Sequence, residues 1–102
     1  MVVKRDGRRE VFSKEKLLSG VRKACEKRPV SADAIEKLVE LVVEAVTEKY
    51  EREIPGRAIG EKVMDQLGKT DHVAYVRFAS VYRRFQEATE FVSEVKKLET
   101  FK

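Results

Sequence analysis

The sequence predicts an α+β fold that is mostly α, with a small N-terminal β-hairpin laid over one end of a four-helix core. An Asp-Gly pair between two short runs of strand-forming residues predicts the hairpin. Apolar residues at helical spacing, behind capping residues, predict the helices. With 102 residues, 42% of them hydrophobic and 39% charged, the chain has the composition of one folded domain with a modest core. We expect this domain to span residues 1–102, with its core at about residues 2–98.

The hairpin is expected from the runs VVKR and RREVF, which flank Asp6-Gly7. Asp-Gly is one of the best pairs for a two-residue type I′ turn, and a loop of this length fixes the register of the two strands. That register would pair Arg5 with Arg8, Lys4 with Arg9, Val3 with Glu10 and Val2 with Val11. Like charges that face each other across a hairpin repel. The hairpin therefore concentrates positive charge, which either water screens or an anion neutralises.

Two helices are expected to follow the hairpin. Ser13 is placed to cap a helix over about residues 14–27, which would end before Arg28-Pro29. Ser31 is placed to cap the second helix. The apolar stripes are Leu17, Leu18, Val21 and Cys25 in the first helix, and Ile35, Leu38, Val39, Val42 and Val46 in the second.

The motif REIPG then interrupts the helical pattern, and Glu53-Ile54 is expected to form a brief strand beside the hairpin. A third helix should end at Gly68, because glycine is common just past helix C-termini. Thr70-Asp71 should open a fourth helix, and a short last helix is expected after Thr89. The stripes are Ile59, Val63, Met64 and Leu67 in the third helix, Val73, Val76, Phe78, Ala79, Tyr82 and Phe85 in the fourth, and Phe91, Val95 and Leu98 in the last.

Composition argues against several kinds of site. Cys25 is the only cysteine and His72 the only histidine, so we expect no internal disulfide and no structural zinc on Cys and His ligands. We interpret Cys25 as a small buried hydrophobe and His72 as a surface residue. Residues 1–12 do not resemble a signal peptide and no apolar run is long enough to span a membrane, so a cytoplasmic location is expected. No carboxylate pair or triad is recognisable, which argues against an enzyme.

The start of the first helix is the best candidate for an anion site. Lys14 and Lys16 stand in its first turn, where cations oppose the helix dipole, and Glu15 offsets only part of this. Lys16 also occupies the position at which a capping box has Glu or Gln. Backbone N–H groups and Lys16 together describe a phosphate site. A solvated basic surface explains the same charges, and the net charge of +4 suits either a duplex nucleic acid or a small polyanion.

Two other motifs resemble ligand-binding motifs, but each has a simpler structural interpretation. Gly68-Lys69-Thr70 matches the end of a P-loop, but Val63 stands where that motif requires a glycine, inside a predicted helix. The aromatic residues of the fourth helix are interpreted as core residues. Tyr82 is the exception, because a phenol at the edge of a core could stack against a base or bond a ribose.

Several stretches resemble the ATP-cone, a nucleotide-binding regulatory domain. VVKRDGRREVFSKEKL resembles its opening signature, and KRPVSADAIEKLV, IPGRAIGEKVMDQL and DHVAYVRFASVYRRF closely resemble one branch of the family. That branch comprises the bacterial transcriptional repressors of ribonucleotide reductase genes. The resemblance runs from Val2 to about Leu98 and implies a hairpin lid over a four-helix bundle. It also implies ATP or dATP as the ligand, often with Mg²⁺ at the phosphates.

The resemblance also implies which residues bind the nucleotide. Val2 and Lys4 match lid positions near the base and nucleotide, Arg5 a phosphate-contacting position, Glu10 a lid carboxylate near the base, Lys16 the helix lysine at the phosphates, and Tyr82 the approach to the sugar. In reductases a histidine often stands at the equivalent of Gly60, so this chain departs from the pattern at the ribose contact.

Full repressors of this branch begin with a zinc ribbon of four cysteines that would contact DNA, whereas this sequence starts at the lid. DNA is therefore expected as a partner only through a ribbon that this sequence lacks, and the sequence fits an excised, a natural standalone or a designed domain. We predict a non-catalytic sensor that binds ATP or dATP and changes its self-association as a homo-oligomer. The alternative is a small basic helical module that binds nucleic acid directly.

Overall fold

The computed structural model describes residues 1–3, 9–83 and 88–98, without the side chains of Glu10 and residues 88–91. The elements in chain order are β1 (Val2–Val3), β2 (Arg9–Glu10), α1 (Lys14–Ala24), α2 (Ala32–Lys49), β3 (Ile54–Pro55), α3 (Gly56–Thr70), α4 (His72–Tyr82) and α5 (Ala88–Leu98). The predicted class, α+β and mostly α, is confirmed.

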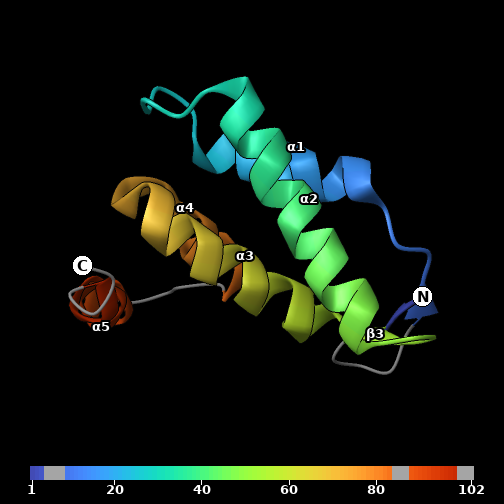
Figure 1. Ribbon diagram of the computed structural model, residues 1–102. Coiled ribbons are helices and arrows are strands. Elements are labelled where there is room, and N and C mark those ends of the chain that lie inside the picture. Colours follow the sequence, from blue (N-terminus) through green and yellow to red (C-terminus); the bar gives the residue numbers. More distant parts are fainter. Residues whose placement is uncertain (4–8, 84–87, 99–102) are drawn as a thin grey trace.

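Helices α1 to α4 pack against one another and enclose the core (Figure 1). Helix α2 contacts both α1 and α3, and α4 contacts α1 and α3 in turn. The strands lie at one end of this bundle, beside the end of α2 and the start of α3, whereas α5 lies next to α4 (Figure 1). The largest fully buried side chains are Val21, Val39, Val42, Val63 and Leu67. They come from α1, α2 and α3, so the core is formed by the apolar stripes of at least three helices together.

The strands form a three-stranded sheet in the order β2-β1-β3. Strand β1 pairs antiparallel with β2 and parallel with β3. Two further bonds hold Met1 beside β3 and the residues before it. The Ile54 N–H donates to the Met1 carbonyl at 2.7 Å, and the Met1 ammonium donates to the Arg52 carbonyl at 3.0 Å. The predicted strand beside the hairpin is confirmed at Ile54. Strand β3 leads directly into α3, so the sheet fixes where that helix begins.

The predicted hairpin register is wrong by one residue. The structure pairs Val2 with Glu10 and Val3 with Arg9, whereas the sequence argument paired Val3 with Glu10. Turn chemistry alone favours the predicted register, but β1 also pairs with β3, and a slip of one residue would turn every side chain to the opposite face. Val2 is buried in the observed register, and its expected partner Val11 is 82% exposed. The type I′ turn and the Arg5–Arg8 pair lie outside the described residues.

Arg9 also has a charged partner that the sequence argument missed. Its guanidinium lies 2.8 Å from a carboxylate oxygen of Glu53, just before β3. Both side chains are about half exposed, so this ion pair contributes little to stability. It nevertheless shows that one cation of the hairpin is compensated from within the chain.

The helix starts predicted at Ser13, Ser31 and Asp71 are confirmed, whereas the last helix begins at Ala88 rather than after Thr89. Two predicted helix ends are wrong. Ser13, Ser31 and Asp71 each accept a hydrogen bond from a backbone N–H of the following helix. Helix α1 ends at Ala24 rather than near residue 27, because the chain turns there and Lys27 adopts a positive φ of 60°. This turn leads into α2, whose five predicted stripe residues are all buried.

Helix α3 runs through Gly68 to Thr70 and does not end at the glycine. The Asp71 N–H donates to the Leu67 carbonyl at 2.9 Å, and the Thr70 hydroxyl donates to the Gln66 carbonyl at 2.8 Å. The prediction relied on the C-cap preference of glycine, but Gly68 is buried inside the helix. Because Gly68-Lys69-Thr70 is helical, the structure agrees that it is no P-loop.

The stripe of α4 is also partly corrected. Ala74, Tyr75 and Ala79 are its buried residues, whereas Val73, predicted to face the core, is 40% exposed. Val76, Phe78 and Tyr82 pack against the edge of the core. In α5, Leu98 is buried and Val95 is 51% exposed. The side chains of Phe85 and Phe91 lie outside the described residues.

Candidate functional site

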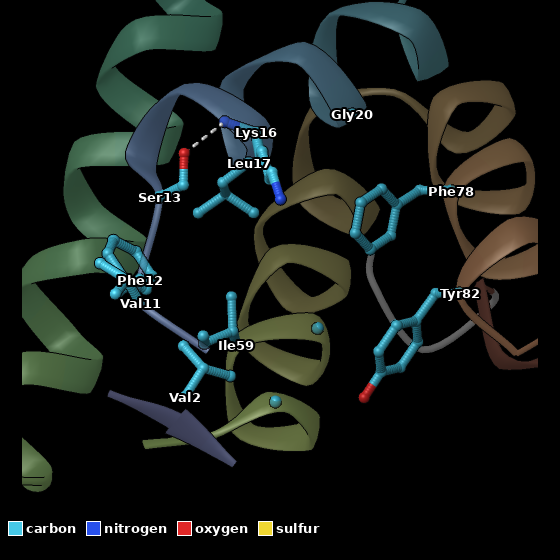
Figure 2. Close-up of a pocket in the computed structure, with 12 residues that line it drawn as sticks. Val2, Val11, Phe12, Ser13, Lys16, Leu17, Gly20, Ile59, Phe78 and Tyr82 are labelled. Carbon is cyan, nitrogen blue, oxygen red and sulfur yellow. Dashed lines mark hydrogen bonds between the residues drawn. The ribbon is translucent and has the colours of Figure 1, made fainter. Parts of the chain in front are cut away.

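A pocket of about 280 Å³ lies between the sheet, the start of α1 and helices α3 and α4. This volume is close to the lower end of the range for small-molecule sites, about 300 Å³. Its lining residues are Val2, Val11, Phe12, Ser13, Lys16, Leu17, Gly20, Gly56, Ile59, Gly60, Phe78 and Tyr82. They come from four separate stretches of the chain, so only the complete fold brings them together (Figure 2).

The polar side of the pocket is the first turn of α1. Ser13 caps the helix by accepting a hydrogen bond from the Lys16 N–H at 3.2 Å (Figure 2). The other N–H groups of a first turn have no acceptor within the helix and carry its positive dipole end. The Lys16 side chain extends from this turn toward the space in front of Phe78 (Figure 2). A positive side chain and a positive helix end thus face the same space.

The remaining walls are mostly apolar. Val2 from the sheet and Ile59 from α3 form one side, and Phe78 and Tyr82 from α4 form another (Figure 2). The rings of Phe78 and Tyr82 are stacked, with their centroids 6.0 Å apart and their planes at 18°. Such a pocket can hold a flat apolar group while its charged end binds an anion.

Tyr82 lies directly over Gly60, and the contact leaves no room for a side chain. A Cβ atom at residue 60 would lie 2.2 Å from two carbon atoms of the Tyr82 ring. The Tyr82 hydroxyl donates a hydrogen bond to the Arg57 carbonyl at 3.1 Å, which holds the ring in this position. A histidine at residue 60 would therefore require the tyrosine to move.

The structure brings together only some of the residues that the sequence implicates. Val2, Lys16 and Tyr82 line the same pocket. Glu10 pairs with Val2 in the sheet, but its side chain lies outside the description, as do Lys4 and Arg5.

Sequence reasoning missed several wall residues, namely Phe12, Gly20, Ile59 and Phe78. One signal for them was available, because Lys16 and Gly20, like Phe78 and Tyr82, are four residues apart and so lie on one helix face. Gly20 leaves ordinary room at that wall, since a Cβ atom there would lie 4.0 Å from the Phe78 ring. The position of Ile59 depends on tertiary packing.

Two residues with side chains that could be reactive, His72 and Cys25, do not line this pocket. His72 is exposed at the start of α4, as interpreted. Cys25 is buried, and its burial together with the charge of Asp71 raises the pKa of the thiol. A thiol with a raised pKa is a poor nucleophile, in agreement with its interpretation as a core residue.

The chain matches the family model of the ATP cone domain over residues 1–88. It belongs to the ATP cone family. Similar proteins include the transcriptional repressors NrdR of Geotalea daltonii, with 54% identity, and of Myxococcus xanthus, with 51% identity, each over 98 residues and 96% of this chain. This chain spans 65% of the Geotalea protein and 58% of the Myxococcus protein. The resemblance seen in the sequence is thereby confirmed.

Within the described part of this ATP cone, no three His, Cys, Asp or Glu side chains gather to hold a metal ion. No described carboxylate lines the pocket. None of the described helices has both the length and the apolar character that a membrane span requires.

Metal removal should therefore leave the fold of the ATP cone intact. We expect the helical circular dichroism of the purified protein to be unchanged after treatment with EDTA, because the core is apolar and side chains cap helices α1, α2 and α4. The thermal midpoint measured before and after treatment provides the check. A large loss of helical signal in EDTA would contradict this expectation.

Proposed function

We propose that this chain is a non-catalytic regulatory domain that binds ATP or dATP in the pocket between the sheet and the bundle. The observation that carries the proposal is the convergence of Lys16 and the start of α1 with apolar and aromatic walls in one pocket. A purine nucleotide has two parts that would suit these two surfaces. Its flat base can lie against the apolar and aromatic walls, and its polyanionic phosphate chain can bind at the positive end. Membership of the ATP cone family supports the same ligand.

The residues divide naturally between the parts of the ligand. In our proposal Lys16, the first turn of α1 and Arg5 bind the phosphates, and Lys4 contributes to the lid near the nucleotide. Val2 and Glu10 lie near the base, and Tyr82 contacts the sugar. Because Tyr82 fills the space over Gly60, its ring takes the place of a side chain at residue 60. Magnesium would accompany the phosphates, without a protein carboxylate among the described wall residues.

The output we propose is a change in self-association that serves transcriptional repression. The similar proteins are transcriptional repressors, and this chain would supply the nucleotide-sensing part of such a repressor of ribonucleotide reductase genes. Nucleotide can shift an association equilibrium only through its different affinities for the two states. DNA contact would come from a zinc ribbon, which this sequence does not contain.

A titration with ATP, dATP and duplex DNA at low and moderate salt tests the ligand class. Binding to a DNA backbone releases counterions and weakens steeply with salt, whereas a nucleotide in a partly apolar pocket should lose less affinity. The proposal expects saturable binding of ATP or dATP at moderate salt and little binding of duplex. Salt-sensitive binding of duplex without nucleotide binding would favour the alternative, a basic module for nucleic acid.

Self-association should depend on the nucleotide. We expect the molar mass measured by light scattering to differ between the free protein, the ATP-bound protein and the dATP-bound protein, because the ligand stabilises one arrangement of hairpin and bundle over another. Protein concentration should be varied in each series, since association follows mass action. One unchanged mass under every condition would argue against a self-association output.

A further inference from the structure

Helix α5 is attached to the bundle through a buried carboxylate. Glu94 is 3% exposed. It accepts hydrogen bonds from the Tyr75 hydroxyl at 2.7 Å, from the Lys97 ammonium at 3.2 Å and from the Arg83 guanidinium. Burial alone would raise the pKa of Glu94, but these hydrogen bonds and the nearby positive charges lower it overall. The carboxylate is therefore charged at neutral pH and held by partners on α4 and α5.

Arg83 joins this carboxylate to a third helix. Its guanidinium also donates to both carboxylate oxygens of Glu61 on α3, at 3.1 Å and 3.3 Å. One side chain thus connects α3, the end of α4 and α5. We call Glu61, Arg83 and Glu94 the α5 anchor. A partly buried network of this kind has few alternative arrangements, because each charge would lose its partner if one member moved.

The α5 anchor adjoins the pocket wall in the sequence at two places, on α3 and at the end of α4. Glu61 follows Gly60, and Arg83 follows Tyr82. Tyr82 is the last residue of α4 and Arg83 is its C-cap, a position at which helices are most easily deformed. Because the Tyr82 ring lies on Gly60, displacement of the ring would act on the backbone at Arg83. The same two pairs of neighbours therefore shape the pocket and hold α5.

We propose that the α5 anchor couples the docking of α5 to the occupancy of the pocket, with Arg83 and Glu94 as positioning residues for the wall formed by Tyr82 and Gly60. This inference has two halves. The mechanical half is the link between the pocket wall and the docking of α5. The ligand half is the effect of nucleotide on that link, and it rests on the proposed function. Coupling between two sites is reciprocal. Nucleotide should thus stabilise the docked α5, and a weakened anchor should weaken nucleotide binding.

The mechanical half is tested without any nucleotide. Gly60→Ala places a methyl group where the Tyr82 ring lies, so hydrogen exchange of the amides in residues 92–98 should accelerate by about fivefold or more. Gly20→Ala is the matched control, because it adds the same methyl group to the same pocket at ordinary contact distance from Phe78. It should leave α5 exchange unchanged. Equal exchange in Gly60→Ala and the parent would overturn the coupling.

The ligand half is tested by calorimetric titration with ATP. Glu94→Gln keeps an acceptor for Tyr75 but removes the charge that Arg83 binds, so the Kd for ATP should rise about fivefold or more. Glu44→Gln makes the same change at an exposed position on α2 and should leave the Kd unchanged. ATP should also slow the hydrogen exchange of the α5 amides in the parent protein. If Glu94 had only a structural role, ATP would leave this exchange rate unchanged.

The outcomes separate the two proposals. If the parent binds ATP but neither the Kd of Glu94→Gln nor the α5 exchange responds, the coupling is overturned and the proposed function stands. If the parent binds no ATP, the proposed function is overturned together with the ligand half. Faster α5 exchange in Gly60→Ala would then still support the mechanical link. That measurement does not depend on whether Glu94→Gln folds.

Discussion

Asp71→Ala should destabilise the fold by about 3 kcal/mol, through the loss of a helix cap of about 1 kcal/mol and of a charged hydrogen bond of about 2 kcal/mol. The carboxylate accepts a hydrogen bond from the Ala74 N–H at 2.9 Å and bonds from the Arg28 Nε at 3.0 and 3.1 Å. It thus caps α4 and ties the turn between α1 and α2 to the corner between α3 and α4. Arg28 is about one third exposed and can regain water, which keeps the estimate at the lower end for a broken buried pair.

Thermal and urea unfolding of the parent, Asp71→Ala and Asp33→Ala would measure this effect. Asp33 stands in the first turn of α2 and is exposed, so its replacement should cost about 0.5 kcal/mol or less. The thermal midpoint of Asp71→Ala should fall by roughly 10–20 °C for a domain of this size. If the two aspartate variants unfold alike, the corner does not depend on Asp71.

The same residue should make stability depend on pH. Burial would raise the pKa of Asp71, but the hydrogen bonds from Arg28 and Ala74 outweigh it and lower the pKa overall. A lowered folded-state pKa stabilises the fold above the unfolded-state pKa of about 4, and this stabilisation is lost as the pH falls through the folded-state value. The parent should thus lose more stability than Asp71→Ala between about pH 5 and pH 2. Parallel pH profiles would contradict the role of the ion pair.

Lys16→Glu should have opposite effects on the free protein and on nucleotide binding. A glutamate there would complete a capping box with Ser13 and match the helix dipole, so the free protein should gain about 0.5–1 kcal/mol. Binding of ATP should weaken by roughly 2 kcal/mol or more, about thirtyfold, because a charge-assisted contact is replaced by repulsion. Lys4→Ala should weaken binding more mildly.

Thermal melts and calorimetric titration of Lys16→Glu provide both readouts. Lys37→Glu is the matched control, since it reverses the same charge at an exposed position on α2 outside the pocket. It should leave ATP binding nearly unchanged. If Lys16→Glu binds ATP as well as Lys37→Glu does, the lysine belongs to a solvated surface and the proposed phosphate site is wrong.

Local chemistry made much of this fold predictable. Ser13, Ser31 and Asp71 cap helices through their own side chains. The buried residues of α2 recur at helical spacing within one segment, so their periodicity is visible in the sequence. The register of the hairpin was not predictable in this way, because pairing with the distant Ile54 and the burial of Val2 decide it. Gly68 shows the same limit, since the C-cap preference of a glycine yields to its packing inside α3.

The pocket was predictable only in part for the same reason. Lys16 could be recognised because it breaks a helix-start rule in its own segment. The contact between Gly60 and Tyr82 joins two helices and exists only in the assembled bundle. The buried Glu94 and its partner Tyr75 likewise lie far apart in the sequence. Their pairing could not be predicted from periodicity, which describes one helix at a time.

In the proposed complex, the phosphates of a nucleotide bind at the start of α1, while its base and sugar lie against the walls from the sheet, α3 and α4. Amide chemical shifts of the parent protein, titrated at moderate salt with ATP and in parallel with adenosine, test this arrangement most directly. We expect both ligands to shift the amides of Phe78, Tyr82 and Ile59, and only ATP to shift those of residues 13–17. Shifts scattered over exposed lysines, or none in the pocket at saturating ATP, would contradict it.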